Sequence, residues 1–84
     1  MRLSPRERTL ILEYGYPFDN IEKQLKRHAS SRAEVNITDD SYWWEQVAGQ
    51  LAITVNEDLA PDRGGIWDEV NDLADRIEYE LRAN

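Results

Sequence analysis

Few side chains in this sequence have the chemistry that catalysis requires. The chain has one histidine, His28, and no cysteine, so an imidazole base has a single candidate and a thiolate nucleophile has none. No serine stands in the Gly-x-Ser-x-Gly setting that exposes a nucleophile, and the spacings of zinc-protease, EF-hand and P-loop motifs are absent. We therefore expect no catalytic residue, no cofactor and no metal, and predict that the protein is not an enzyme.

A row of carboxylates is the first feature that could bind something. Asp68, Asp72 and Asp75 follow one another at helical spacing and form what we call the acidic ridge. A straight helix does not wrap six or more oxygens around a calcium ion, as a flexible loop does. The ridge is therefore either a solvated helix face or a surface that binds a basic protein partner.

Three consecutive aromatic residues are the second feature. Tyr42, Trp43 and Trp44 stand at the start of an expected helix, where successive side chains point about 100° apart, so the three span about 200°. One core cannot bury all three. Trp44 belongs to the inward stripe of that helix. Tyr42 shares another face with Gly49 and Ile53, where the glycine lets a second element approach closely.

That helix therefore has two apolar sides, and two interpretations stay open. In the first, the helix is central and its own chain covers both sides. In the second, Tyr42, Trp43 and Ile53 form an exposed patch that binds another chain, since Trp and Tyr are favoured interface anchors. Tyr16 and Trp67 are further candidate anchors for a partner.

The charge of the chain excludes one class of ligand and is unevenly distributed. Seventeen acidic and ten basic residues give a net charge of −7, which argues against direct binding of nucleic acid. Residues 1–32 hold seven bases and four acids, whereas residues 33–84 hold three bases and thirteen acids. The two parts should attract each other within the fold, and acidic surface left over would meet a basic partner.

Capping residues place the first two helices that must position these groups. Ser4 and Glu7 have the spacing of a capping box and begin a helix that ends at Gly15, which we expect to be left-handed. Asp19 is the expected cap of a second helix over about residues 20–29.

Hydrophobic periodicity places the remaining elements. Residues 34–38 predict a short extended segment, residues 42–56 a third helix and residues 66–82 a fourth, with a loop over residues 59–65. An apolar alternation leaves residues 51–55 open between helix and strand. The predicted fold is an all-α, compact bundle of about four helices that forms a single domain over residues 1–84.

The opening residues 3–8, Leu-Ser-Pro-Arg-Glu-Arg, resemble the start of a LuxR-type helix-turn-helix domain. That resemblance implies a basic recognition helix further along the chain. Residues 33–45, where this helix would stand, contain four acids and no base. We therefore exclude DNA binding through that fold.

These observations predict a non-enzymatic, acidic, helical protein-interaction module, either an adaptor or an inhibitor. Its partner is another protein or a second copy of the chain. The alternative is an acidic decoy that occupies the basic groove of a nucleic-acid-binding protein, as in phages and mobile elements. The decoy would use the acidic ridge and four further aspartates, Asp39, Asp40, Asp58 and Asp62. No apolar run reaches the length of a membrane span and no secretion signal is present, so we expect a cytoplasmic protein.

Overall fold

Four helices and a two-stranded antiparallel sheet make up the regular structure of residues 1–59 and 65–83, which are the residues that the computed structural model describes. In chain order they are β1 (Arg2–Leu3), α1 (Pro5–Tyr14), α2 (Asp19–Arg27), β2 (Val35–Asn36), α3 (Ser41–Glu57) and α4 (Ile66–Ala83). The mostly helical fold predicted from the sequence is confirmed. Most of the predicted loop, residues 60–64, lies outside the described residues.

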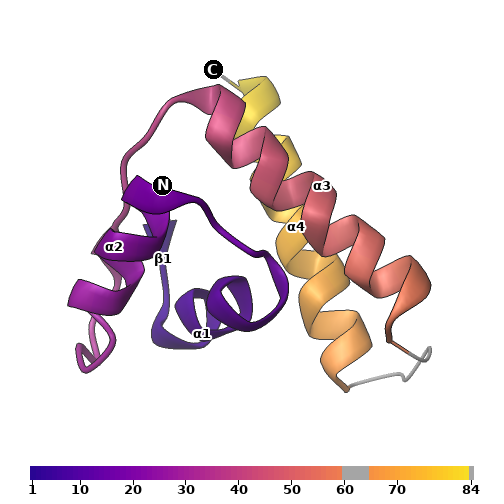
Figure 1. Cartoon of the computed structure of the whole chain (residues 1–84), viewed down its shortest axis with the longest axis horizontal. Coiled ribbons are helices and arrows are strands. Elements are labelled where there is room, and N and C mark those ends of the chain that lie inside the picture. Colours follow the sequence, from indigo (N-terminus) through magenta and orange to yellow (C-terminus); the bar gives the residue numbers. More distant parts are fainter. Residues whose placement is uncertain (60–64, 84) are drawn as a thin grey trace.

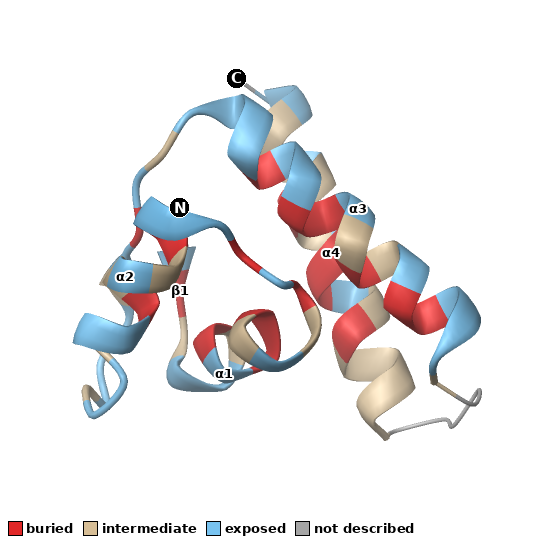
Figure 2. Cartoon of the chain, viewed as in Figure 1, coloured by how far each residue is buried: buried red, intermediate tan, exposed pale blue. Residues whose placement is uncertain are grey.

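The two longest helices, α3 and α4, pack side by side in antiparallel directions (Figure 1). The predicted stripes of both helices supply much of the core: Trp44, Val47, Ala48, Leu51 and Val55 on α3, with Val70, Leu73 and Ile77 on α4. These buried positions face one another and α1 (Figure 2). Residues 51–55 are helical, which settles the ambiguity of their alternation. None of the described helices is both long and apolar enough to cross a membrane.

The smaller N-terminal part consists of α1, α2 and the sheet. The Ser4–Glu7 capping box is present at the start of α1, as predicted. Val35 and Asn36 lie in the predicted extended segment and pair with β1, which sequence reasoning missed because two residues are too short to show a period. The element that follows α2 is thus β2 and not a helix, so the order of elements departs from a helix-turn-helix domain.

A buried arginine links these pieces. Arg8 on α1 is only 2% exposed, and its guanidinium donates hydrogen bonds to the backbone carbonyls of Leu3 (3.0 Å), Ala33 (2.9 Å) and Ser31 (2.6 Å). A guanidinium has five N–H donors in a fixed fork, which suits it to several acceptors at once. Arg8 therefore holds both β1 and the turn before β2 against α1.

Two predicted turn details are wrong. Gly15 has φ −94°, so it is not left-handed, and the positive φ of 43° belongs to Tyr16. Gly15 is needed for space instead, because a Cβ there would lie 2.9 Å from the carbonyl oxygen of Ile11. The expected cap of α2, Asp19, is its first helical residue, and the cap position is held by Phe18 without a side-chain hydrogen bond.

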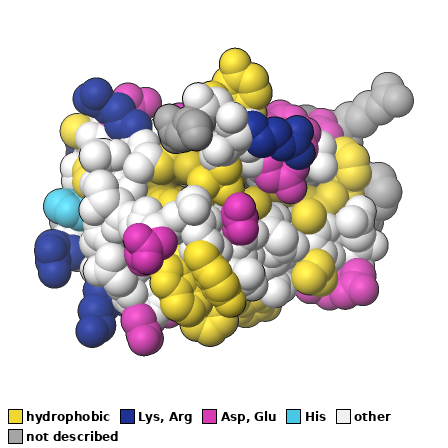
Figure 3. Space-filling model, turned by 90° about the horizontal axis from the view of Figure 1, so that it is seen from above, with side chains coloured by type: hydrophobic (Ala, Val, Ile, Leu, Met, Phe, Trp, Pro, Cys, Tyr) yellow, Lys and Arg dark blue, Asp and Glu magenta, His cyan; other side chains and the backbone are white. Residues whose placement is uncertain are grey.

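Ion pairs join α1 to α4. Arg6 pairs with Glu69 (2.6 Å), which is the expected attraction between the basic and acidic parts of the chain. The second pair has the opposite polarity, since Arg76 on α4 binds Glu7 on α1. The bases of α2 take no part in this contact, because α2 packs on α1 and away from α4. They leave a basic end on the molecule (Figure 3).

We expect the Glu7–Arg76 pair to make stability fall in acid. Burial raises the pKa of the Glu7 carboxyl, but the hydrogen bonds that it accepts from Arg76 and Ser4 lower it more, so this pKa lies below its ordinary value. The resulting stabilisation is complete above the unfolded pKa of about 4.3 and is lost as the pH falls through the folded pKa. Glu7→Gln should therefore flatten the decline in unfolding free energy between about pH 5 and pH 3. The exposed Glu13 gives the control, Glu13→Gln, and an equal slope in both variants would contradict the assignment.

We expect Arg8 to be the polar side chain on which folding depends most. Arg8→Met removes three hydrogen bonds to backbone carbonyls at a buried position, so the free energy of unfolding should fall by about 2–3 kcal/mol. Urea unfolding followed by circular dichroism measures this loss. Arg6→Met on the same helix is the control, and it should cost clearly less because its ion pair is exposed. Equal losses of unfolding free energy in the two variants would show that the burial of Arg8 adds no stability beyond that of an exposed arginine.

Candidate functional site

On the side of α3 that faces away from α4, one row of residues is uncharged and uncovered, and the exposed Glu45 and Glu57 lie at its edges. Tyr42, Gln46, Gly49 and Ile53 follow one another along it at helical spacing, and we call this the outer face of α3. Tyr42 is 53% exposed and Ile53 48%, and a Cβ built on Gly49 would meet no atom within 4 Å. Surface helices normally place charged residues on the face opposite the core. The second apolar side of this helix is therefore left open by the described part of the chain.

An exposed cluster of aromatic rings lies at the N-terminal end of this face. The ring centroids of Tyr42 and Trp43 are 4.9 Å apart, and those of Phe18 and Trp43 are 5.3 Å apart. Phe18 is 57% exposed and Trp43 37%. We call Phe18, Tyr42 and Trp43 the aromatic cluster. Seen from above, hydrophobic side chains gather at the surface with carboxylates beside them (Figure 3).

The segment between α1 and α2 runs beside α3 and extends the cluster. Its first end is held where the hydroxyl of Thr54 donates to the carbonyl of Tyr14 (3.0 Å). Its second end is held where Phe18 packs on Trp43. Tyr16 lies between these two anchors and is exposed. Aromatic side chains from two separate segments therefore flank the same helix.

The structure places most of the predicted patch residues along one side of α3 and leaves Trp67 apart from them. Ile53 is on the same face as Tyr42 but eleven positions further, about 16 Å at 1.5 Å per residue. Trp67 lies at the other end of α3, where its indole N–H donates to the carbonyl of Val55 (3.1 Å). Sequence reasoning missed Phe18, and the signal that could have found it is the pair of aromatic residues around Pro17.

A hollow of about 240 Å³ opens beside the aromatic cluster. It is lined by Phe18, Asp19, Asn20, Asp39 and Trp43. Gln24 fixes one wall because its side-chain amide exchanges two hydrogen bonds with the backbone of Thr38, of 2.8 and 3.1 Å. The amide of Asn20 donates to Asp39 (3.3 Å). We call this space the cluster hollow.

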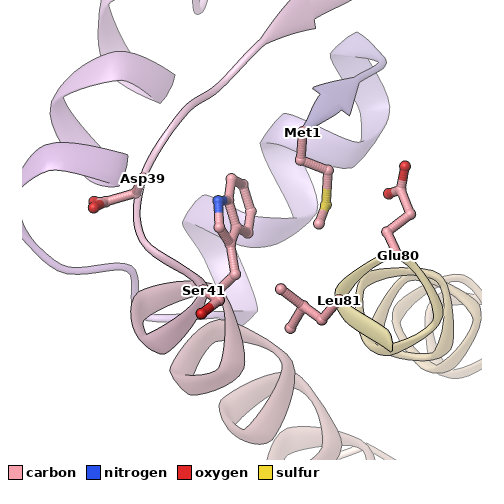
Figure 4. Close-up of a pocket in the computed structure, with 6 residues that line it drawn as sticks. Met1, Asp39, Ser41, Glu80 and Leu81 are labelled. Atoms are coloured by element: carbon pink, nitrogen blue, oxygen red, sulfur yellow. The ribbon is translucent and has the colours of Figure 1, made fainter. Parts of the chain in front are cut away.

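A second hollow, of about 310 Å³, lies between the start of the chain, the start of α3 and the end of α4 (Figure 4). The amino group of Met1 donates to the carbonyl of Ile37 (2.6 Å), and burial lowers the pKa of this amine. Met1 and Leu81 point toward each other across the hollow, whereas the carboxylate of Asp39 points away from both (Figure 4). Together with its hydrogen bond from Asn20, this direction places the Asp39 carboxylate toward α2 and the cluster hollow.

The acidic ridge lies on α4, with Asp72 and Asp75 exposed and Asp68 half-buried. Within residues 1–59 and 65–83, no three side chains of His, Cys, Asp or Glu come together in a way that could hold a metal ion. His28 is half-buried at the end of α2. Of the aspartates considered with the ridge, Asp62 lies outside the described residues.

Comparison of the chain with protein-family models, with curated proteins and with solved structures gave no match in any of the three. The functional proposal therefore rests on the geometry of the molecule.

The two adjacent tryptophans should respond differently to truncation. Trp44 is buried in the core, so Trp44→Ala should lower the free energy of unfolding by about 3–5 kcal/mol. Trp43 is 37% exposed and touches Phe18 and Tyr42 at the surface, so Trp43→Ala should cost less, about 2 kcal/mol. Urea unfolding of both variants measures the difference. A loss for Trp43 as large as that for Trp44 would place Trp43 in the core and remove it from the candidate site.

Proposed function

We propose that this chain is a non-enzymatic protein-interaction module, an adaptor or an inhibitor, which binds another protein chain through one surface. That surface combines the aromatic cluster with Tyr16 and Ile53, and we call it the docking surface. The observation that carries the proposal is the outer face of α3, which is uncharged and uncovered in a chain of which 32% of the residues are charged.

The composition of the docking surface supports this proposal. The cores of protein interfaces are depleted in charge and enriched in Tyr, Trp and Phe, and the residues that dominate binding are most often Trp, Tyr and Arg. Five large apolar side chains about half exposed present on the order of 400–500 Å². A standard interface buries about 800 Å² per partner, so these side chains supply about half of one.

A second copy of the chain is one partner that the docking surface would accept. Each copy has a net charge of −7, so two copies repel each other unless they meet where no charge is present. The row of Tyr42, Gln46, Gly49 and Ile53 carries no charge itself, although Glu45 and Glu57 border it, and Gly49 leaves room for a second backbone.

The exposed Asp72 and Asp75 support the second candidate function, an acidic decoy for a basic groove. Ion pairs with α1 neutralise neighbouring parts of α4, since Glu69 and Arg76 are both paired. A decoy would bind with steep salt dependence, because its contacts are between exposed charges. Binding through the docking surface would persist in high salt.

Site-specific photo-crosslinking tests the proposed function. A photoreactive phenylalanine analogue at Tyr42 should give a discrete adduct in lysates of cells that produce the protein, both at low and at high salt concentration. An adduct of twice 9.8 kDa would identify a second copy. Tyr79 on α4, exposed and outside the docking surface, provides the matched control position, where we expect no discrete adduct.

Two results would contradict the proposal. The same adducts at both positions would show that the docking surface has no preference for a partner. An adduct at Tyr79 alone that disappears in high salt would favour the acidic decoy, since Tyr79 follows the acidic ridge on α4.

A further inference from the structure

The cluster hollow has the lining of a site for a positively charged side chain. We propose that it receives a lysine or arginine side chain of the partner, while the partner's apolar residues cover the aromatic cluster. This inference rests on the proposed function and adds the chemistry of the partner: a protein segment with a basic residue beside an apolar one.

The lining of the cluster hollow is negatively charged. Two of the five residues that line the hollow, Asp19 and Asp39, are carboxylates, and none of the five is basic. Asp39 is half-buried, so its charge is screened less than that of a fully exposed group. The hollow also lies at the N-terminus of α2, where Asp19 is the first residue, but the partial positive charge there, roughly half a unit, is smaller than that of two carboxylates. A cation entering the hollow would therefore be attracted.

Two hydrogen bonds fix the orientation of the Asp39 carboxylate. One of its oxygens accepts from the Asn20 amide (3.3 Å), and the other accepts from the backbone N–H of Asp40 (2.7 Å). A carboxylate offers about four acceptor positions, so these two bonds fix its direction and still leave positions for a guest. The site is therefore oriented before the guest arrives, which reduces the entropy lost on binding.

Phe18 and Trp43 give the hollow aromatic walls. The faces of Phe18 and Trp43 carry partial negative charge and attract cations, most strongly at tryptophan. The aliphatic stem of a lysine or arginine can pack on the rings while its charged head meets the carboxylates. At about 240 Å³ the hollow holds several times the roughly 30 Å³ that one water molecule occupies. An apolar guest would displace water from the two carboxylates without neutralising their charge, so the lining favours a guest that has both an aliphatic stem and a positive charge.

Titration with a single capped amino acid tests the inference without requiring the partner. We would follow the indole N–H signals of the three tryptophans and the side-chain amide of Asn20 by NMR while adding N-acetyl-arginine amide. Its neutral isostere, N-acetyl-citrulline amide, is the matched ligand control. We expect saturable shifts at Trp43 and Asn20 with the arginine compound and much smaller ones with the citrulline compound. The Trp67 indole, bonded to Val55 at the other end of α3, should stay unshifted.

Two neutralising variants separate the hollow from the general negative charge of the chain. Asp39→Asn keeps an acceptor for the N–H of Asp40 and removes the charge, so it should weaken arginine binding at least about threefold. Asp72→Asn removes one charge from the exposed acidic ridge and should leave this affinity unchanged. Lys23 stands one turn beyond Asp19 on α2, so Lys23→Gln should strengthen binding by removing a competing positive charge. Unfolding midpoints equal to the wild type confirm that each variant is folded.

The outcomes distinguish this inference from the proposed function. Equal shifts with both compounds, or equal losses from Asp39→Asn and Asp72→Asn, would overturn the cation site. If Tyr42 still gives its crosslinked adduct under those conditions, the interaction module stands and its partner meets the hollow with something other than a cation. If arginine binds selectively but no adduct forms at Tyr42, the hollow is a cation site and the proposed protein docking fails.

Discussion

The three hydrogen bonds from the buried guanidinium of Arg8 to backbone carbonyls are the constraint on which the rest of the N-terminal half depends. They hold β1 and the turn after α2 to a single side chain of α1, which lets β1 and β2 pair although each has only two residues. The chain leaving β2 is then pinned to α2 by Gln24 and enters α3 in a fixed direction. Arg8 therefore contributes indirectly, through β2 and Gln24, to placing Asp39 and Trp43 beside α2.

The charges of the chain are arranged in two different ways. Between α1 and α4, ion pairs of both polarities hold the N-terminal part on the long helices. The basic residues at the end of α2 stay apart from the acidic surface of α4, because among the helices α2 packs on α1 and not on α4. On the face shown in Figure 3, Lys and Arg side chains gather at one end of the molecule, and carboxylates outnumber them over the rest. Neutralisation within the fold is incomplete, and the chain keeps a net charge of −7.

One side of α3 packs in the core, and the opposite side is exposed. Trp44 and the inward stripe meet α4 and α1, whereas Tyr42 and Ile53 lie where no described element of the chain reaches. A domain of 84 residues can bury only about 60–65% of its unfolded surface. Covering the second apolar side of α3 would need another layer of structure, and a partner chain can supply that layer.

The sequence by itself determined the elements whose signals are local. The capping box of Ser4 and Glu7, the two long amphipathic helices and their buried stripes depend on neighbouring residues, so spacing alone predicts them. It also predicted that Tyr42, Trp43 and Trp44 cannot share one core. Only the tertiary structure decided that the described chain leaves the second side of α3 exposed, that Phe18 packs on Trp43, and that Trp67 lies at the far end of α3. Those contacts join residues distant in the chain, and their geometry depends on how helices pack, which no local pattern encodes.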